Sequence, residues 1–167
     1  MANYESFYRT NYFKVKDADQ FKRFMALASS CSEDLTVYEN DNHDGTYMIC
    51  GYGEPAFYTE NIRECFDTVP QEIKDKEPTP EEFEKFLKDN NIEDSEGDIF
   101  FNVLQALIAE DDAVIYKEAG HEKMRYIGVC VGVITSNKIA WVHVNNELMG
   151  MARNMLQNPE WNTKLEY

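Results

Sequence analysis

The stretch from Met124 to Val144, MRYIGVCVGVITSNKIAWVHV, determines the fold class. Valine and isoleucine are frequent in both of its halves, which is typical of β-strands, and Ser136-Asn137 between the halves suits a tight turn. We therefore expect a hairpin with strands at 124–135 and 138–144. Because apolar residues occupy odd and even positions alike between 129 and 134, the first strand is expected to be interior and covered on both faces.

Four further segments, earlier in the chain, are rich in aromatic and β-branched residues and predict strands. The turn-forming residues Asn40–Gly45 join two of these segments into a second hairpin. Strands that follow one another through such short connections pair antiparallel. The four segments are Tyr8–Val15, Leu35–Glu39, Thr46–Tyr52 and Ala113–Lys117.

Helical patterns fill the intervals between the strands. Residues 17–20 (DADQ) have the form of a capping box and precede an apolar stripe, so a helix is expected to begin there. Residues 79–82 (TPEE) predict a second helix start, and a further helix opens at Ser95. Asn145 or Asn146 caps a final helix. Its apolar residues are expected to face the core: Leu148, Met151, Met155 and Leu156.

Together these elements predict a single α+β domain over residues 1–167, built on a mainly antiparallel sheet of about six strands. The expected order is β-α-β-β-(α-α-α)-β-β-β-α. The bracketed helices form an insertion at residues 57–110, which is rich in Asp and Glu.

The charge of the chain is strongly negative and unevenly distributed. The 167 residues include 16 Lys and Arg against 31 Asp and Glu, which gives a net charge of −15. Residues 33–112 contain 23 of the acidic residues and 5 of the basic ones, a net charge of −18. One side of the folded molecule should therefore be anionic. Direct binding of nucleic acid is not expected, because it depends on Lys and Arg that neutralise phosphates.

A continuous anionic surface attracts a basic partner at long range, and added salt weakens that attraction. The sequence therefore predicts a non-enzymatic inhibitor or adaptor that binds a basic protein, such as one that handles nucleic acid. Acidic faces also serve simply to keep proteins soluble, and the sequence leaves that interpretation open. The expected contact residues are Tyr58, Asp75, Glu77, Glu81, Glu84, Asp89, Glu93, Asp94 and Glu96.

Two segments suggest a kind of origin. Arg9–Asp17 (RTNYFKVKD), followed by Phe21 and Phe24, and Glu118–Tyr126 (EAGHEKMRY) resemble small acidic proteins of phages, plasmids and conjugative elements. The resemblance implies an accessory protein of a mobile element and assigns no site residues. Such elements often carry acidic inhibitors of host defence, so it also implies an anti-restriction or anti-CRISPR role.

No pattern in the chain predicts catalysis, a cofactor or a bound metal. The four cysteines do not form a C-x-x-C pair, the three histidines do not form His-x-x-x-His, and phosphate-binding glycine motifs are missing. The alternative function is a small-molecule-binding or enzymatic domain with a pocket between the sheet and the inserted helices. In that case His121 or His143 would line the pocket.

The chain shows no run of about 18 apolar residues that could cross a membrane and no secretory leader, so a cytoplasmic protein is expected. A further possibility is a homodimer formed by an exposed apolar helix face that is complementary to itself. Exposed tyrosines are typical contact residues. Five tyrosines lie where neither periodicity buries them: Tyr4, Tyr38, Tyr52, Tyr58 and Tyr167.

Overall fold

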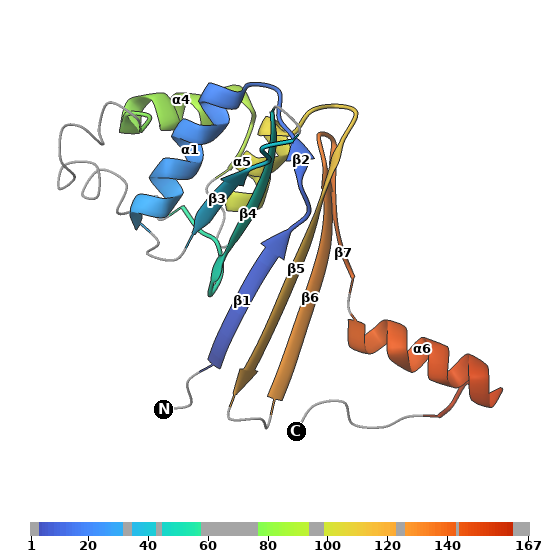
Figure 1. The fold of residues 1–167 in the computed structure, drawn as a ribbon. Helices are drawn as coiled ribbons and strands as arrows, with labels where there is room; N and C mark the ends of the chain where they lie inside the picture. Colours follow the sequence, from blue (N-terminus) through green and yellow to red (C-terminus); the bar gives the residue numbers. More distant parts are fainter. Residues whose placement is uncertain are drawn as a thin grey trace.

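The computed structural model describes residues 4–31, 35–42, 45–57, 77–93, 99–122, 126–142 and 144–161. Its strands are antiparallel and form one sheet in the order β2-β4-β1-β5-β6-β7, with β3 paired to β4. The α+β class is thus confirmed, with seven strands (Figure 1). The elements are β1 (Tyr4–Thr10), β2 (Phe13–Lys14), α1 (Ala18–Cys31), β3 (Thr36–Glu39), β4 (Thr46–Tyr52), α4 (Pro80–Asp89), α5 (Ile99–Leu107), β5 (Ala113–Glu122), β6 (Tyr126–Thr135), β7 (Lys138–Val142) and α6 (Val144–Leu156).

Both predicted hairpins are present. β3 pairs with β4, and Gly45 between them has a φ of 80°, which a residue with a side chain adopts only with strain. β6 pairs with β7 up to Thr135 and Lys138, on either side of the predicted turn. The start of α1 also agrees, because the Asp17 carboxylate accepts a hydrogen bond from the Gln20 backbone N–H at 2.9 Å.

The first strand differs from its prediction, because the chain forms two strands where the sequence indicates one. Asn11 lies between β1 and β2, and its side chain forms hydrogen bonds with the backbone of β5. Its Oδ1 accepts from the Ile115 N–H at 2.7 Å and its Nδ2 donates to the Ala113 carbonyl at 3.0 Å. β5 is longer than expected, since pairing with both β1 and β6 extends it to Glu122.

The core lies between the sheet and helices α1, α4 and α5, which gather at one end of the sheet (Figure 1). Phe21 of α1 is completely buried and lies against Phe13 and Tyr47, with ring centroids 5.7 and 4.9 Å away. At the other end of the core, Phe101 of α5 packs on Trp141 at 4.8 Å. The long strands β1, β5 and β6 extend beyond the helices (Figure 1).

The prediction that β6 is covered on both faces is wrong for the chain as described. β6 is interior, between β5 and β7, but Val129 and Val133 on one of its faces are 47% and 37% exposed. The helices cover only the opposite face, on which Ile134 is completely buried.

The prediction that the apolar stripe of the last helix faces the core is also wrong. Leu148, Met151, Met155 and Leu156 are all more than half exposed, and Met155 reaches 82%. The physical reason is where α6 begins. β7 is an edge strand, α6 starts two residues after its end, and the helix extends away from the sheet (Figure 1).

Candidate acidic interface

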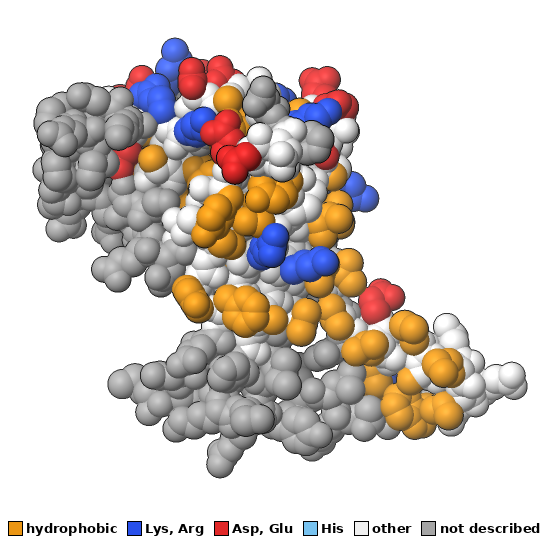
Figure 2. All heavy atoms as spheres, viewed as in Figure 1, with side chains coloured by type: hydrophobic (Ala, Val, Ile, Leu, Met, Phe, Trp, Pro, Cys, Tyr) orange, Lys and Arg blue, Asp and Glu red, His pale blue; other side chains and the backbone are white. Residues whose placement is uncertain are grey.

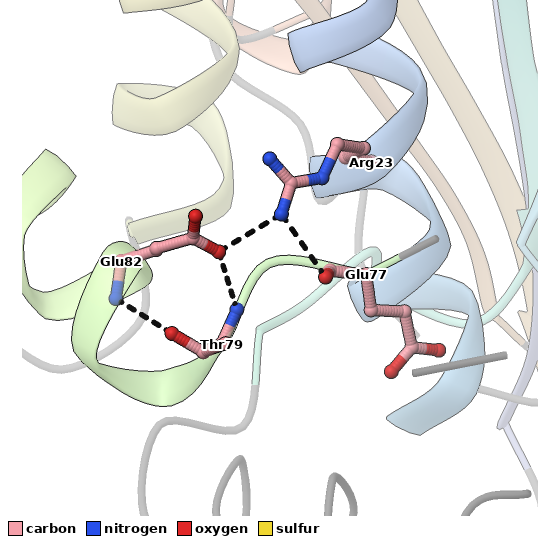
Figure 3. A network of polar contacts seen from close by, with 4 residues as sticks. All are labelled: Arg23, Glu77, Thr79 and Glu82. Carbon is pink, nitrogen blue, oxygen red and sulfur yellow. Dashed lines mark hydrogen bonds and ion pairs between the residues drawn. The ribbon is translucent and has the colours of Figure 1, made fainter. Parts of the chain in front are cut away.

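The central described element of the acidic region is α4, and its N-terminus is strongly specified. Thr79 is the N-cap: its hydroxyl accepts from the Glu82 N–H at 3.2 Å, and the Glu82 carboxylate accepts from the Thr79 N–H at 2.8 Å. Figure 3 shows this reciprocal pair, which is a capping box at the helix start that the sequence predicts. Pro80 takes the first helical position.

The same carboxylate joins α4 to α1. Arg23 of α1 donates from Nη2 to Glu82 Oε2 at 2.8 Å and to the Glu77 backbone carbonyl at 3.3 Å (Figure 3). The hydrogen bond from the Thr79 backbone lowers the pKa of Glu82 below its ordinary value of 4.5; partial burial opposes this, and the Arg23 charge adds to the lowering. Arg23 therefore neutralises one acid of the region and fixes how α4 sits on α1.

Glu82 should make the stability of the protein depend on pH. Its pKa is lower in the folded protein than in the unfolded chain, so its contribution is fully present above pH 4.5 and is lost as pH falls through the folded pKa. We expect the free energy of unfolding to fall less steeply below pH 4.5 in Glu82→Gln than in the wild type, as measured by urea denaturation. In Arg23→Gln, too, the free energy of unfolding should fall less steeply with pH than in the wild type. Identical slopes in all three proteins would contradict this role for Glu82.

The structure exposes four of the predicted contact residues and buries one. Glu81, Glu84, Asp89 and Glu93 are exposed along α4 and the segment that follows it. Glu77 is 1% exposed, so it does not lie on that surface as predicted. The chain turns inward before the capping box. The backbone carbonyl of Glu77 accepts the hydrogen bond from Arg23, and the Glu77 carboxylate points away from Arg23 (Figure 3). The remaining four lie outside the described residues: Tyr58, Asp75, Asp94 and Glu96.

Lys and Arg side chains lie next to Asp and Glu side chains at the helical end of the molecule (Figure 2). Lys85 and Lys88 follow Glu81 and Glu84 by four residues, a spacing that places each lysine one helical turn from a glutamate. Among the described residues, ion pairs join bases of the N-terminal part to acids of residues 33–112: Lys14–Asp111 at 3.4 Å, Lys22–Glu39 at 2.8 Å and Arg23–Glu82 at 2.8 Å. The described surface is thus acidic with local compensation, not uniformly anionic.

A groove of about 450 Å³ separates α1 from α4 on this side of the molecule. Its charged lining includes Asp17, Asp19 and Asp89 in addition to the Arg23–Glu82 pair and Lys85. It is open to solvent and shallow, which suits a side chain or loop of a partner better than an enclosed ligand.

The opposite side of the sheet has a different character. Arg9 of β1 pairs with Lys117 of β5, and both are exposed. At the outward-facing positions of β1 and β3 to β7 whose side chains are described, none is Asp or Glu. We call this surface the outer sheet face; its exposed or half-buried members include Phe7, Arg9, Tyr38, Tyr52, Ile115, Lys117, Val129, Val131, Val133 and Val142.

Sequence reasoning predicted the exposure of Tyr38 and Tyr52 but missed the rest of this face. In β1 the exposed residues Phe7 and Arg9 alternate with the buried residues Ser6, Tyr8 and Thr10. A phenylalanine and an arginine on one side of a strand do not by themselves indicate whether that side faces solvent. The pairing partners of β1 in the sheet were needed to decide this.

Nothing in the described part of the chain forms a metal-binding group of His, Cys, Asp or Glu. Between the sheet and α5, the rings of Phe101, Tyr116 and Trp141 pack against one another. The alternative function, with a pocket between the sheet and the inserted helices, stays a prediction. Burial, followed by the charges of Glu118 and Glu54, raises the pKa of the Cys130 thiol and makes it a poor nucleophile. The side chains of His121 and His143 lie outside the described residues.

None of the helices within the described ranges is long and apolar enough to cross a bilayer. Comparison of the chain with protein-family models, with curated proteins and with solved structures found no match.

Proposed function

We propose that this protein is a non-enzymatic binding protein that presents an acidic, helical side to a basic surface of another protein. The observation that carries the proposal is the separation of charge between the two sides of the sheet. The outer sheet face includes Arg9 and Lys117 and no carboxylate among its described side chains, whereas Glu81, Glu84, Asp89 and Glu93 are exposed on and after α4.

The amount of charge suits a partner that normally binds nucleic acid. Duplex DNA carries one charge per about 1.7 Å of its axis, so 18 charges correspond to about 30 Å of duplex. The net charge of −18 within residues 33–112 is of that size. Such a surface competes for a channel lined with Lys and Arg, and the approach is steered at long range. An inhibitor of a nucleic-acid-handling protein is the form of the proposal that this comparison favours.

The narrower form of the proposal is an anti-restriction or anti-CRISPR protein of a mobile element. It depends on the resemblance of residues 9–17 and 118–126 to small acidic proteins of such elements. The first segment contains the end of β1 and all of β2, and the second contains the end of β5 and the first residue of β6. The resembling segments therefore belong to the sheet, and the binding residues belong to the helical side.

Charge reversal at the end of α4 tests the proposal. Asp89→Lys with Glu93→Lys should fold, because cations near the C-terminus of a helix are favourable. Immobilised wild-type protein should retain basic proteins from a cell lysate at low salt, and the double variant should retain several-fold less of the same proteins. Mass spectrometry of the retained proteins at two salt concentrations measures both effects.

A matched control carries the same change in net charge elsewhere. Glu147→Lys with Glu160→Lys reverses two exposed acids that lie outside residues 33–112, and it should bind as the wild type does. The proposal is wrong if the retained proteins stay bound to the wild type at high salt. It is also wrong if both double variants lose binding of these proteins to the same extent.

A further inference from the structure

Two apolar surfaces lie open to solvent in the described part of the chain, and they are of complementary kinds. One is the outer sheet face, whose apolar side chains Phe7, Tyr52, Ile115, Val129, Val133 and Val142 are between 37% and 69% exposed. The other is the stripe of α6, formed by Leu148, Met151, Met155 and Leu156. Figure 2 shows apolar side chains gathered over the middle of the molecule and over α6, on the same side of it.

The outer sheet face lacks the pattern of a face that remains in water. Antiparallel sheets with one solvated face alternate apolar residues toward the core with polar residues toward solvent. β6 instead places Val129, Val131 and Val133 outward while Ile134 points into the core. The composition of this strand is that of one covered twice, and the helices described here cover it once.

We propose that the missing cover is a second copy of this chain, in which the α6 stripe of each protomer packs on the outer sheet face of the other. A helix with an apolar stripe and a sheet with an apolar face are the two surfaces that globular layers bring together. Each protomer supplies one of each, so a two-fold axis makes both contacts at once and leaves neither surface open.

Charge complementarity supports the same arrangement. Arg9 and Lys117 lie directly opposite each other on β1 and β5, in the middle of the outer sheet face. Like charges in this position repel, and no described outward side chain of the sheet supplies a carboxylate to offset them. Glu147 is exposed in the first turn of α6, next to Leu148 of the stripe. Packing of α6 on a second protomer brings an acid toward this basic pair.

The position of α6 favours contact with another molecule over closure on its own sheet. Only residue 143 separates the end of β7 from the start of α6, and the helix extends past the edge of the sheet (Figure 1). Its apolar stripe is therefore presented beyond the outline of its own protomer.

The first test is the molar mass of the full chain in solution, measured by light scattering during gel filtration. The wild type should have twice the mass of one chain. Met155→Glu in the stripe and Phe7→Glu on the sheet should each reduce it to that of one chain, with unchanged circular dichroism. Gly150→Glu adds the same charge to the other side of α6, where an added Cβ meets nothing within 4 Å, and should remain dimeric. Met151→Glu and Val129→Glu replace either variant that does not fold.

The second test distinguishes helix-on-sheet packing from other dimers. Homodimers of Met155→Glu have no intact stripe, and homodimers of Phe7→Glu have no intact sheet face. A mixture of the two variants restores one normal helix-on-sheet contact per pair. The mixture should therefore form dimers that neither variant forms alone.

A wild-type monomer, a dimer unaffected by Met155→Glu, or a mixture that stays monomeric would each overturn the inference. The result is independent of the proposed function, because the two respond oppositely to salt. The apolar contact persists at high ionic strength, where repulsion between two chains of net charge −15 is screened, whereas binding through the acidic side is lost.

Discussion

Replacing Phe21 with alanine is expected to lower the free energy of unfolding by about 3–5 kcal/mol, the range for a fully buried phenylalanine. The side chain is 0% exposed in α1 and makes an edge contact with Phe13 and a tilted contact with Tyr47. These neighbours come from β2 and β4, so the cavity opens where the helix meets two strands. Rigid neighbours on the sheet limit how far the site can collapse around it.

Urea denaturation of the wild type, Phe21→Ala and Phe21→Leu measures the effect. Leucine keeps most of the apolar volume, so its loss should be clearly smaller than that of alanine. A loss of less than about 1 kcal/mol for alanine would mean that this ring is not a centre of the core, because only surface substitutions have so little effect.

Gly132→Ala is the second substitution with a large expected effect. A Cβ at residue 132 would lie 2.5 Å from Cζ3 and 2.7 Å from Cε3 of Trp141, its pairing partner on β7. The indole must therefore shift, which disturbs its packing on Phe101 and Tyr116, whose ring centroids lie 4.8 and 5.8 Å from it. Overpacking of this kind costs about 1–3 kcal/mol.

The measurement is again the free energy of unfolding, with Trp141 fluorescence followed in a Trp161→Phe background. Trp141→Leu should reduce the cost of Gly132→Ala, because the smaller side chain leaves room for the new methyl group; the double-mutant cycle measures this coupling. Gly150→Ala is the control, since its Cβ meets nothing and alanine favours the helix. Equal stability of Gly132→Ala and the wild type would show that Trp141 does not lie over this glycine.

Local signals in the sequence were sufficient for the hairpins and for the starts of α1 and α4. The capping box at Thr79 and Glu82, the Asp17 cap and the turn at residues 136 and 137 each depend on residues close together in the chain. These interactions form within a few residues, so their chemistry can be inferred before the fold is known.

Features that depend on distant neighbours could not be inferred in this way. The break between β1 and β2 follows from Asn11 bonding to β5, more than one hundred residues away. The burial of Glu77 depends on how the chain enters α4, and the exposure of the α6 stripe depends on the position of β7 at the sheet edge. The apolar periodicity of α6 correctly identified a helix, but periodicity does not say which molecule covers its stripe.

The candidate interface was predictable as a region and less so residue by residue. Acidic composition identified α4, and the structure exposes Glu81, Glu84, Asp89 and Glu93 there. The composition of the acidic region did not reveal that Arg23 and Lys22 of α1 neutralise two neighbouring acids. The charges of the flanking segments therefore shape the surface as much as the acids do.

The most direct measurement of where this molecule attracts a basic partner is a titration with a polylysine peptide, followed by amide NMR spectra of the labelled protein. We predict shifts at the amides of residues 79–93 and of the first turn of α1, which disappear when salt is added. Amides of β5 to β7 should stay in place throughout. Shifts confined to those strands, or shifts on α4 that persist at high salt, would contradict an electrostatic helical side opposite an apolar sheet.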